Sequence, residues 1–379
     1  MTVLAVNVGS SSVKLRWLED ECVVATADIS SGPAVADGDL AYGVESAVSA
    51  CPRPQAVVHR IVHGGSRLRE AVLIDDAVMH TLRDLTDLAP DHQRRALAVI
   101  GALRASLPDI PHVAVFDTAF HSTLPPAATT LAIPVEWREA WGVRRFGFHG
   151  LSHAYSSRRA LELLGRRHGR VVVAHLGSGC SLAATVDGQS VETTMGFTPL
   201  DGLVMGTRSG SVDPGLIPWI EAHHGVSSAR ALEALEHESG LRALAGTADM
   251  REVVSRSLHG PERDRAQLAL DVFIHRLVLG IGSMAAAAGG MDALVFTGGI
   301  GENSPHIRAA AAPRLRHLGV RVDGERNSLV GAYDRDIAEA SAPCRVYVVR
   351  AREEVQMVRA SAGVLQRASA RLRASAMDP

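Results

Sequence analysis

Two short runs of the sequence place arginine and histidine among glycines. RRFGFHGLSH occupies residues 144–153, and MGTRSGSVDPG occupies residues 205–215. Guanidinium and imidazole groups in a site that excludes water can stabilise a triply charged phosphoryl group during its transfer. A single arginine is more often a surface salt-bridge partner, and a single histidine is more often a hydrogen-bonded core residue. The neighbouring glycines favour the functional interpretation, because they allow close approach to the backbone.

Glycine-rich turns follow three predicted strands, around Gly9, at residues 177–179 and at residues 298–301. Such turns can present backbone N–H groups to phosphate oxygens, although most glycine turns only reverse the chain. The sequence has neither a Walker A pattern nor a Rossmann GxGxxG pattern, so a phosphate site must use another architecture.

Two charged residues lie at the ends of apolar strands: Asp117 in VFDTAFH and Arg60 in HRIVHGG. A carboxylate in this position can orient an arginine, contact a metal or cap the next helix. His149 and His153 form an HxxxH pair, but the glutamate of a zinc HExxH motif is missing, which argues against zinc.

Lys14 is the single lysine, beside 38 arginines. Codon bias is the ordinary explanation. The alternative is that a compact ammonium is retained there for its chemistry, which a planar guanidinium does not reproduce.

Strand and helix patterns predict how these residues are positioned. Thr2–Val8 and Val13–Leu18 predict a hairpin, and residues 171–175 and 182–186 predict a second one. The two hairpins indicate either two copies of one phosphate-handling domain across a cleft or two unrelated hairpins. Further predicted elements are strands at 56–62, 112–116, 293–297 and 345–349, and helices at 85–107 and 264–289.

Composition excludes several classes of protein. The 379 residues suffice for two or three domains, and a net charge of −2 does not favour nucleic acid as a partner. Four widely spaced cysteines predict a reducing cytoplasm without structural zinc. The N-terminus lacks a signal-peptide pattern, and we expect no membrane segment, because no apolar stretch reaches the ~18 residues that would be needed. The Gly/Ala-rich stretch 277–291 is expected to be a buried helix.

Seven runs together resemble the acetate kinase family, which includes propionate and butyrate kinases. They are VNVGSSSVK, HRIVHGG, FDTAFH, RRFGFHGLSH, HLGSG, MGFTPLDGLVMGTRSG and TGGIGEN, in family order between residues 3 and 303. The resemblance implies an α/β fold of two ribonuclease H-like domains around a cleft, shared with actin, Hsp70 and sugar kinases. We expect domains at 1–149, completed by a C-terminal helix at 355–370, and at 150–354. The resemblance also implies a homodimer.

The resemblance implies roles for individual residues. It assigns catalysis to Asp117, His149 and Arg208. It assigns the carboxylate substrate to Arg60 and a small acyl pocket to Val62, Phe148 and Pro199. It assigns Mg²⁺ to Asn7 and Glu353, with phosphate oxygens as further ligands. It assigns ATP binding to Ser10, Ser12, Lys14, His175, Gly177, Gly179, Asp249, Arg251, Gly299, Gly301 and Asn303.

The implied reaction is direct, reversible in-line transfer of the ATP γ-phosphoryl group to a short-chain carboxylate. No base is needed, because a carboxylate with a pKa of about 4 is already ionised at neutral pH. Catalysis then consists of positioning and charge stabilisation.

Four departures from the family pattern leave alternatives open. Asp91 stands where the family has a leucine of the acyl pocket, Ser178 replaces an asparagine, Ser211 replaces an aspartate, and TNEE becomes Ala351-Arg352-Glu353-Glu354. A kinase of a more polar carboxylate, a non-catalytic nucleotide-binding or regulatory homologue, and a chaperone-like or filament-forming ATPase remain as alternatives. Acyl-chain preference and the choice of ATP or GTP also stay open.

Overall fold

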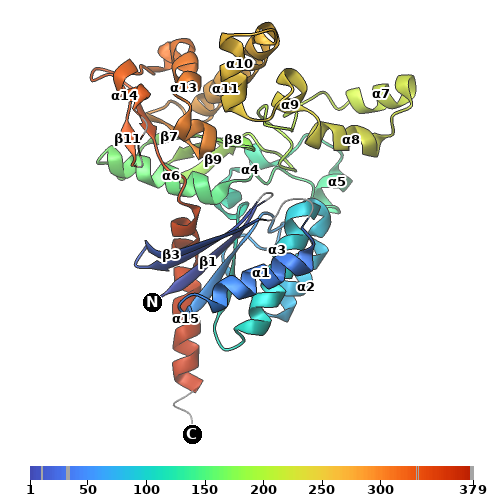
Figure 1. Cartoon of the computed structure of the whole chain (residues 1–379), viewed down its shortest axis with the longest axis vertical. Coiled ribbons are helices and arrows are strands. Elements are labelled where there is room, and N and C mark those ends of the chain that lie inside the picture. The colour runs from blue at the N-terminus through green and yellow to red at the C-terminus, as the bar shows by residue number, and fades with distance from the viewer. Residues whose placement is uncertain (10–11, 31–34, 330, 332, 376–379) are drawn as a thin grey trace. The chain divides into compact units, whose positions relative to one another are not determined.

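The computed structural model describes residues 1–9, 12–30, 35–329, 331 and 333–375, without the side chains of residues 90, 91, 369 and 371–375. The chain forms two compact units, each built around its own sheet (Figure 1). Unit 1 comprises residues 1–122, 148–151 and 352–379. Unit 2 comprises residues 123–147 and 152–351. The domain boundaries expected from the sequence stay a prediction.

The sheet of unit 1 has the strand order β3-β2-β1-β4-β6-β5. The strands are β1 (Val3–Val8), β2 (Ser12–Glu19), β3 (Cys22–Ser30), β4 (Ala56–Ile61), β5 (Val72–Leu73) and β6 (His112–Phe116). Strands β1, β4 and β6 are parallel, and the outer pairs are antiparallel. The central strands are buried on both faces, which explains their nearly continuous runs of valine, alanine and isoleucine.

The helices of unit 1 cover this sheet. They are α1 (Asp37–Ser49), α2 (Asp76–Asp84), α3 (Pro90–Ser106) and α15 (Glu353–Ser375), with the 3₁₀ turns η1 (Thr86–Leu88) and η2 (Ala119–Thr123). α1 packs on α3 and β3, and α3 packs on β4 and β1, with Leu40, Val44, Val99 and Leu103 in one buried core. α15 lies along β1, β4 and β6, so that its first turn reaches the strand ends. Helix α1 was not among the elements predicted from the sequence.

The sheet of unit 2 has the order β11-β12-β10-β7-β8-β9. The strands are β7 (Arg170–Leu176), β8 (Cys180–Val186), β9 (Gln189–Thr193), β10 (Ala293–Thr297), β11 (Arg335–Asp336) and β12 (Arg345–Val348). Read from its other edge, this sheet repeats the order and the parallel or antiparallel sense of every pair in unit 1. Even the register shift between the second and third strands recurs, at Trp17/Leu18 and at Ala184/Thr185. Of the two interpretations of the hairpins, the internal repeat is therefore the one that the structure shows.

Most of the helices belong to unit 2. They are α4 (Pro126–Thr129), α5 (Val135–Glu139), α7 (Leu216–His224), α8 (Ser228–His237), α9 (Gly240–Ala245), α10 (Met250–Leu258), α11 (Arg263–Ala287), α12 (Gly298–Asn303), α13 (Pro305–Ala311), α14 (Gly324–Ser328) and the 3₁₀ turn η3 (Ala312–Leu318). Helix α6 (Gly150–Leu163) begins in unit 1 and continues in unit 2. Residues 298–303, predicted as a glycine-rich turn, form helix α12 instead, because glycine at Gly298 permits the positive φ of 77° from which the helix departs.

Helix α11 is long and apolar enough to cross a membrane by length and composition, with a mean hydropathy of 1.6 over 18 residues. The expectation that no stretch reaches this length was therefore wrong. α11 packs on β7, β8 and β9, and 44% of that window is buried inside unit 2. A core helix passes the same test, so this feature is weak evidence for a membrane segment.

All four cysteines are free thiols.

Candidate active site

In unit 1 the carboxyl ends of β1, β4 and β6 carry a cluster of ionic and polar groups. Arg60 donates from Nε to Asp117 Oδ1 at 3.0 Å and from Nη2 to Asp117 Oδ2 at 2.6 Å, which makes a two-pronged ion pair. Its Nη1 donates to Asn7 Oδ1 at 2.9 Å, and Asn7 Nδ2 donates to Glu353 Oε2 at 2.8 Å. Four residues from four distant parts of the sequence are thus joined in one network. Parallel pairing brings them together, since Asn7 and Arg60 lie near the ends of neighbouring strands.

Burial strengthens this network. The side chain of Arg60 is 13% exposed and that of Asp117 is 2% exposed. Burial opposes the charge on Arg60, but the charges of Asp117 and Glu353 prevail and raise the pKa of its guanidinium. Burial raises the pKa of the Asp117 carboxyl, while its contacts with Arg60 oppose that rise. The alternative of Asp117 as a helix cap is not what the structure shows, because both carboxylate oxygens contact Arg60.

The segment 148–150 is held against Asp117 in the same unit. Gly150 N donates to the carbonyl of Asp117 at 3.0 Å, and a Cβ at Gly150 would come within 2.1 Å of that oxygen. His149 has a positive φ of 54°, a strained conformation for a non-glycine residue that is frequent at active sites. Phe148 is buried, its ring meets the His63 ring edge-on at 5.5 Å, and its carbonyl contacts His121 Nε2 at 3.0 Å. The backbone conformation at His149 is therefore fixed by its neighbours.

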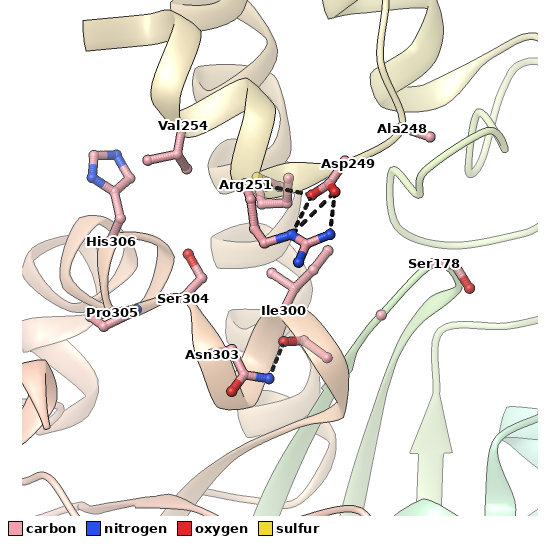
Figure 2. A pocket seen from close by; sticks show the side chains of 13 residues that line it. Ser178, Ala248, Asp249, Arg251, Val254, Ile300, Asn303, Ser304, Pro305 and His306 are labelled. Atoms are coloured by element: carbon pink, nitrogen blue, oxygen red, sulfur yellow. Dashed lines mark hydrogen bonds and ion pairs between the residues drawn. The ribbon is translucent and has the colours of Figure 1, made fainter. Parts of the chain in front are cut away.

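Unit 2 contains a cavity of about 810 Å³ (Figure 2). Gly177 and Ser178 come from the β7–β8 turn, Asp249 and Arg251 from the start of α10, and Gly299 and Asn303 from α12. Met250, Val254, Ile300 and Pro305 add apolar surface, and Ser304 and His306 were not predicted from the sequence. An apolar cavity with a few convergent polar groups and exposed glycine backbone is the usual form of a nucleotide-sized site.

Asp249 and Arg251 form an ion pair at the edge of this cavity. Asp249 caps α10 by accepting from Arg251 N at 2.8 Å, and the Arg251 guanidinium folds back onto the same carboxylate (Figure 2). These hydrogen bonds lower the pKa of Asp249. The Arg251 side chain is 89% exposed, so solvent weakens the pair and the guanidinium can turn toward a ligand.

A buried arginine, Arg308, holds the last turn of helix α12 in place. Arg308 is fully buried and donates to the carbonyls of Gly301 at 2.7 Å and Glu302 at 3.0 Å. It also donates to the Asn327 side chain at 2.7 Å and the Asn327 carbonyl at 2.9 Å. Burial, with a smaller contribution from Arg335, lowers the pKa of Arg308 to about 10. Glu302 accepts from Gly298 N and Ala351 N, so the first and last turns of this short helix are both tethered.

The β7–β8 turn is supported by two histidine–serine contacts. His175 Nδ1 lies 2.7 Å from Ser152 Oγ, and His153 Nε2 lies 2.7 Å from Ser181 Oγ. The His153 interaction supports its interpretation as a hydrogen-bonded core residue. Burial raises the pKa of Cys180, just after the turn, to about 12, so this thiol is not a nucleophile.

The predicted site residues thus fall into two groups and a remainder. Unit 1 joins Asn7, Arg60, Asp117 and Glu353, and the cavity of unit 2 is lined by Gly177, Asp249, Arg251, Gly299 and Asn303. His175, Gly179 and Gly301 lie beside the cavity lining and are not part of it. Ser12 and Lys14 lie on β2, with Lys14 opposite Asn7. Ser10 and the Asp91 side chain lie outside the described residues. All of these functional roles stay predictions.

Sequence reasoning missed several residues that support the site. Arg308 and His306 follow the third glycine-rich segment, whereas Arg145 and Glu302 lie within the predicted runs RRFGFHGLSH and TGGIGEN, where no role was assigned to them individually. The signal for Arg308 is only a charged residue within an otherwise apolar helix, which alone does not distinguish a buried arginine from a surface one. Among the described residues, no group of three or more His, Cys, Asp or Glu side chains is arranged to hold a metal ion.

Comparison with known proteins places this geometry in a family. Residues 48–359 match the model of the Acetokinase family. A protein called acetate kinase from Trichormus variabilis is 46% identical over 318 residues, 83% of this chain and 78% of that protein. The acetate kinase of Deinococcus deserti is 41% identical over 394 residues, 96% of this chain and 98% of that protein.

Solved structures agree with this match. A propionate kinase from Francisella tularensis superposes with a TM-score of 0.86 at 33% identity, over 95% of this chain and 98% of that one. The acetate kinase of Porphyromonas gingivalis gives a TM-score of 0.86 at 32% identity, over 96% of this chain and 99% of that one. The predicted fold class is therefore confirmed.

Proposed function

Because the chain belongs to the acetokinase family, whose members transfer a phosphoryl group from ATP to a short-chain carboxylate, we propose that its substrate is acetate and its product acetyl phosphate. The observation that carries this proposal is the ionic network of Arg60, Asp117, Asn7 and Glu353. It offers a cation for a carboxylate and hard oxygen ligands for a metal within one buried cluster.

In the proposed reaction an acetate oxygen attacks the γ-phosphorus of ATP. The new O–P bond forms as the bond to the β–γ bridging oxygen breaks, and ADP leaves with that electron pair. No proton moves, since the attacking carboxylate is already ionised. Asp117 orients Arg60 through the two-pronged pair, and Arg60 neutralises and aims the attacking carboxylate.

His149 and Arg208 complete the proposal as donors to the transferring phosphoryl group, where charge is spread over three oxygens. The positive φ at His149 supports this role, because the backbone accepts strain to hold the ring in one direction. Val62, Phe148 and Pro199 are proposed as walls for the acyl group.

We propose that Mg²⁺ is the metal and that Asn7 and Glu353 would hold it. Their side chains already lie together at 2.8 Å, and an amide oxygen with a carboxylate suits a hard cation that takes its remaining ligands from phosphates and water. When bound, the ion would neutralise charge on the β- and γ-phosphates. Asn7 Oδ1 faces Arg60 Nη1, so the same residue links the metal site to the substrate cation.

The cavity of unit 2 is proposed to hold ATP. Met250, Val254, Ile300 and Pro305 suit the faces of a base, and the exposed backbone of Gly177 and Gly299 suits phosphate oxygens. Ser12, Lys14, Asp249, Arg251 and Asn303 are proposed as polar contacts of the nucleotide. We further propose a cytoplasmic homodimer that binds neither nucleic acid nor membrane, and light scattering on the purified chain checks its mass.

A kinase of a more polar acid is the second candidate, favoured by Asp91 in place of an apolar pocket residue. Wild type and Arg208→Ala are incubated with Mg-ATP, hydroxylamine and acetate, propionate, butyrate or a hydroxy acid. Hydroxamate from acetate that is lost in Arg208→Ala supports the main proposal. Preference for the hydroxy acid, reversed in Asp91→Leu, supports the second candidate. Hydroxamate from no acid refutes both.

A further inference from the structure

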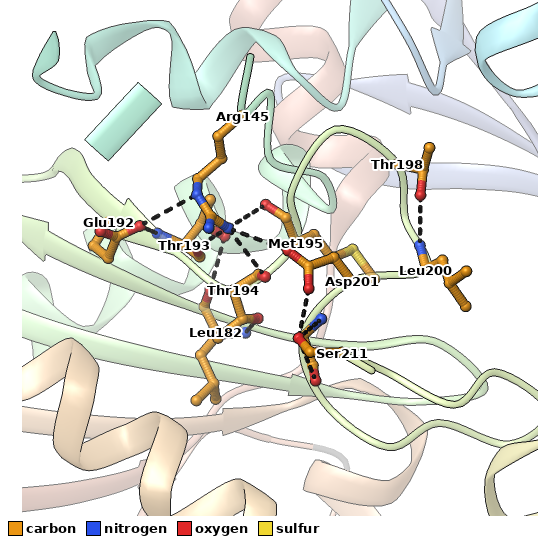
Figure 3. A network of polar contacts seen from close by, with 11 residues as sticks. Arg145, Leu182, Glu192, Thr193, Thr194, Met195, Thr198, Leu200, Asp201 and Ser211 are labelled. Carbon is orange, nitrogen blue, oxygen red and sulfur yellow. Dashed lines mark hydrogen bonds and ion pairs between the residues drawn. The ribbon is translucent and has the colours of Figure 1, made fainter. Parts of the chain in front are cut away.

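In unit 2, the Arg145 side chain binds the backbone at the point where β9 ends (Figure 3). Its Nη1 donates to three successive carbonyls, those of Thr193 at 3.1 Å, Thr194 at 3.2 Å and Met195 at 3.2 Å. The carboxylates of Glu192 and Asp201 lie 3.9 Å and 3.7 Å from the same guanidinium. The side chain is 23% exposed, so most of this contact is sheltered from water.

The backbone beside Arg145 reinforces this attachment. Phe146 N donates to the carbonyl of Gly196 at 2.9 Å, and Arg145 N donates to the carbonyl of Thr129 at 2.9 Å. The rings of Phe146 and Phe197 lie 5.9 Å apart. The irregular segment after β9 therefore starts from a defined place.

From Arg145 a chain of polar contacts leads to the neck of a loop. Asp201, which faces Arg145, accepts from Ser211 Oγ (Figure 3). Ser211 Oγ in turn accepts from Gly202 N at 3.0 Å, and Ser211 N donates to the Gly202 carbonyl at 3.1 Å. Gly202 and Ser211 thus close the loop 202–211, which we call the Arg208 loop.

The far part of the Arg208 loop is tied to other elements of unit 2. Gly206 N donates to the carbonyl of Ser178 at 3.0 Å, and Ser209 N donates to the carbonyl of Leu235 at 3.0 Å. Within the loop, Met205 N donates to the Arg208 carbonyl at 3.1 Å. The loop is thus held at its neck and at its far part, so the backbone on both sides of Arg208 has a defined place.

We propose that Arg145 is a positioning residue for the phosphoryl-transfer step, which acts through Asp201 and Ser211 on the direction of Arg208. This inference rests on the role proposed for Arg208. Arginine is required because its planar fork presents several donors to carbonyls and carboxylates at once, whereas a lysine ammonium is a single compact charge. Ser211, one of the departures from the family pattern, is assigned a structural task as the link between Asp201 and Gly202.

The kinetic test is a double-mutant cycle of Arg145→Ala and Arg208→Ala, with Arg145→Lys as the conservative variant. We expect kcat of Arg145→Ala to fall on the order of 10²-fold, as for a small misplacement of a catalytic group, with KM for ATP nearly unchanged. Arg145→Lys should recover only part of this loss. In the Arg208→Ala background, Arg145→Ala should lose little more, because its effect passes through Arg208. If Arg145→Ala lowered kcat by the same factor in wild type and in Arg208→Ala, the proposal would be overturned.

A second measurement needs no substrate. Hydrogen exchange of peptides covering 193–211 should accelerate in Arg145→Ala, while the sheet of unit 2 stays protected. Ser211→Ala, which folds more safely, should accelerate exchange at the loop neck and lower kcat roughly threefold to tenfold, as for one lost hydrogen bond. Arg167→Ala, an exposed arginine of the same unit, is the matched control and should change neither quantity. Unchanged exchange in Arg145→Ala contradicts the proposal.

The activity of Arg208→Ala tests the role of Arg208, and the double-mutant cycle tests the positioning role of Arg145. Full activity in Arg208→Ala would remove the role proposed for Arg208, and with it the proposed route from Arg145 to the phosphoryl group. Loss of activity in Arg208→Ala, together with independent effects of Arg145→Ala, would overturn the positioning role alone.

Discussion

The two sheets of the molecule have the same strand order, yet their carboxyl ends carry different chemistry. In unit 1, β1, β4 and β6 lead to Asn7, Arg60 and Asp117, which form a buried ionic network. In unit 2, β7 and β10 end near His175 and Thr297, and the segments that follow them present the backbone of Gly177 and Gly299 beside the uncharged side chains of Ser178 and Asn303. One scaffold thus provides a charged end suited to a small anion and a metal, and a neutral end suited to a nucleotide.

Each unit also contains a buried arginine, with opposite electrostatics. Arg60 faces carboxylates, and their charge raises its pKa. Arg308 faces carbonyls and the amide of Asn327, and burial lowers its pKa to about 10. Arg60 is therefore part of a charge balance that a substrate can alter, whereas Arg308 holds a helix in place. The following predictions test this contrast.

The largest effect is expected for Arg60→Ala. Removal of the cation leaves the Asp117 carboxylate buried and unpaired and deprives the substrate of its partner. We expect kcat/KM for acetate to fall by at least ~10³-fold, since one lost charge stabiliser already costs about 10²–10³. The hydroxamate assay measures it.

Arg60→Lys is the matched control for that change. It keeps the charge and loses the two-pronged geometry, so it should retain more activity than Arg60→Ala and less than wild type. Equal activity of Arg60→Lys and wild type would contradict the importance of the fork.

Arg308→Met tests the second buried arginine, which lies in unit 2 and contacts uncharged groups. The loss of its hydrogen bonds frees the last turn of α12 and leaves buried carbonyls unsatisfied. We expect unfolding free energy to fall by about 3 kcal/mol, the lower range for breaking a buried charged network. ATP affinity should weaken more than acetate affinity, because α12 lines the cavity that is proposed to hold ATP.

Denaturant unfolding and titration with ATP measure these two quantities. Arg316→Ala, an exposed arginine of the neighbouring turn η3, is the control and should leave both unchanged. A stable Arg308→Met variant with normal ATP binding would remove the distinction between the two buried arginines.

Acidification is expected to destabilise unit 1. Burial lowers the pKa of His63 and of His121 to about 4, and lowers those of His59 and His112 as well. In the unfolded chain these histidines take up protons near their ordinary pKa of 6.5, whereas in the folded unit they do so only at lower pH. The stability from these histidines is therefore complete above about pH 6.5 and is lost as pH falls toward 4, by on the order of 3 kcal/mol for each shift to about 4.

Hydrogen exchange between pH 7.5 and pH 5 locates this effect. Peptides of β4 and β6 should lose protection before peptides of β7 and β10. His121→Gln, which removes one titrating group, should flatten the dependence. Earlier opening of unit 2 would show that these histidines do not control acid stability.

Much of the fold was predictable because local patterns and the repeat agree. The hairpins β1–β2 and β7–β8, the strand β10 and the helices α3 and α11 lie within a few residues of their predicted positions. The echo between the two hairpins left a duplicated architecture open, and the family resemblance then implied two domains of one fold. The exceptions are α12, which glycine propensity argued against, and α1, which lies in a segment with weak periodicity.

The site was predictable only where a motif surrounds each residue. Arg60 and Asp117 stand at strand ends, and their pairing follows from parallel neighbours. The contacts of Arg308 and of Arg145, which lies in the predicted run RRFGFHGLSH, were not predicted, because their partners are mostly backbone carbonyls. A carbonyl is present at every residue, so no sequence pattern identifies which ones a buried arginine will contact. The chain's 38 arginines make this problem acute, since a surface arginine and a buried one look alike in the sequence.

The smallest effects are expected at two adjacent glycines of α12, which separate folding from binding. Gly298 has a φ of 77°, and a Cβ there would come within 2.8 Å of the Leu176 carbonyl oxygen. Gly298→Ala should therefore lower the free energy of unfolding, by about 1–3 kcal/mol for a strained backbone. A Cβ at Gly299 would have no atom within 4 Å. Gly299→Ala should leave stability within about 0.5 kcal/mol of wild type.

Gly299 lines the cavity, so its added methyl group should weaken ATP binding while the fold stays intact. Denaturant unfolding and ATP titration of both variants measure the difference. If Gly299→Ala binds ATP as wild type does, the phosphates do not approach this backbone, and the neutral end of unit 2 would need another explanation. Weaker binding without loss of stability would instead assign the glycine to close contact with the ligand, which is the role proposed for the ionic network of unit 1.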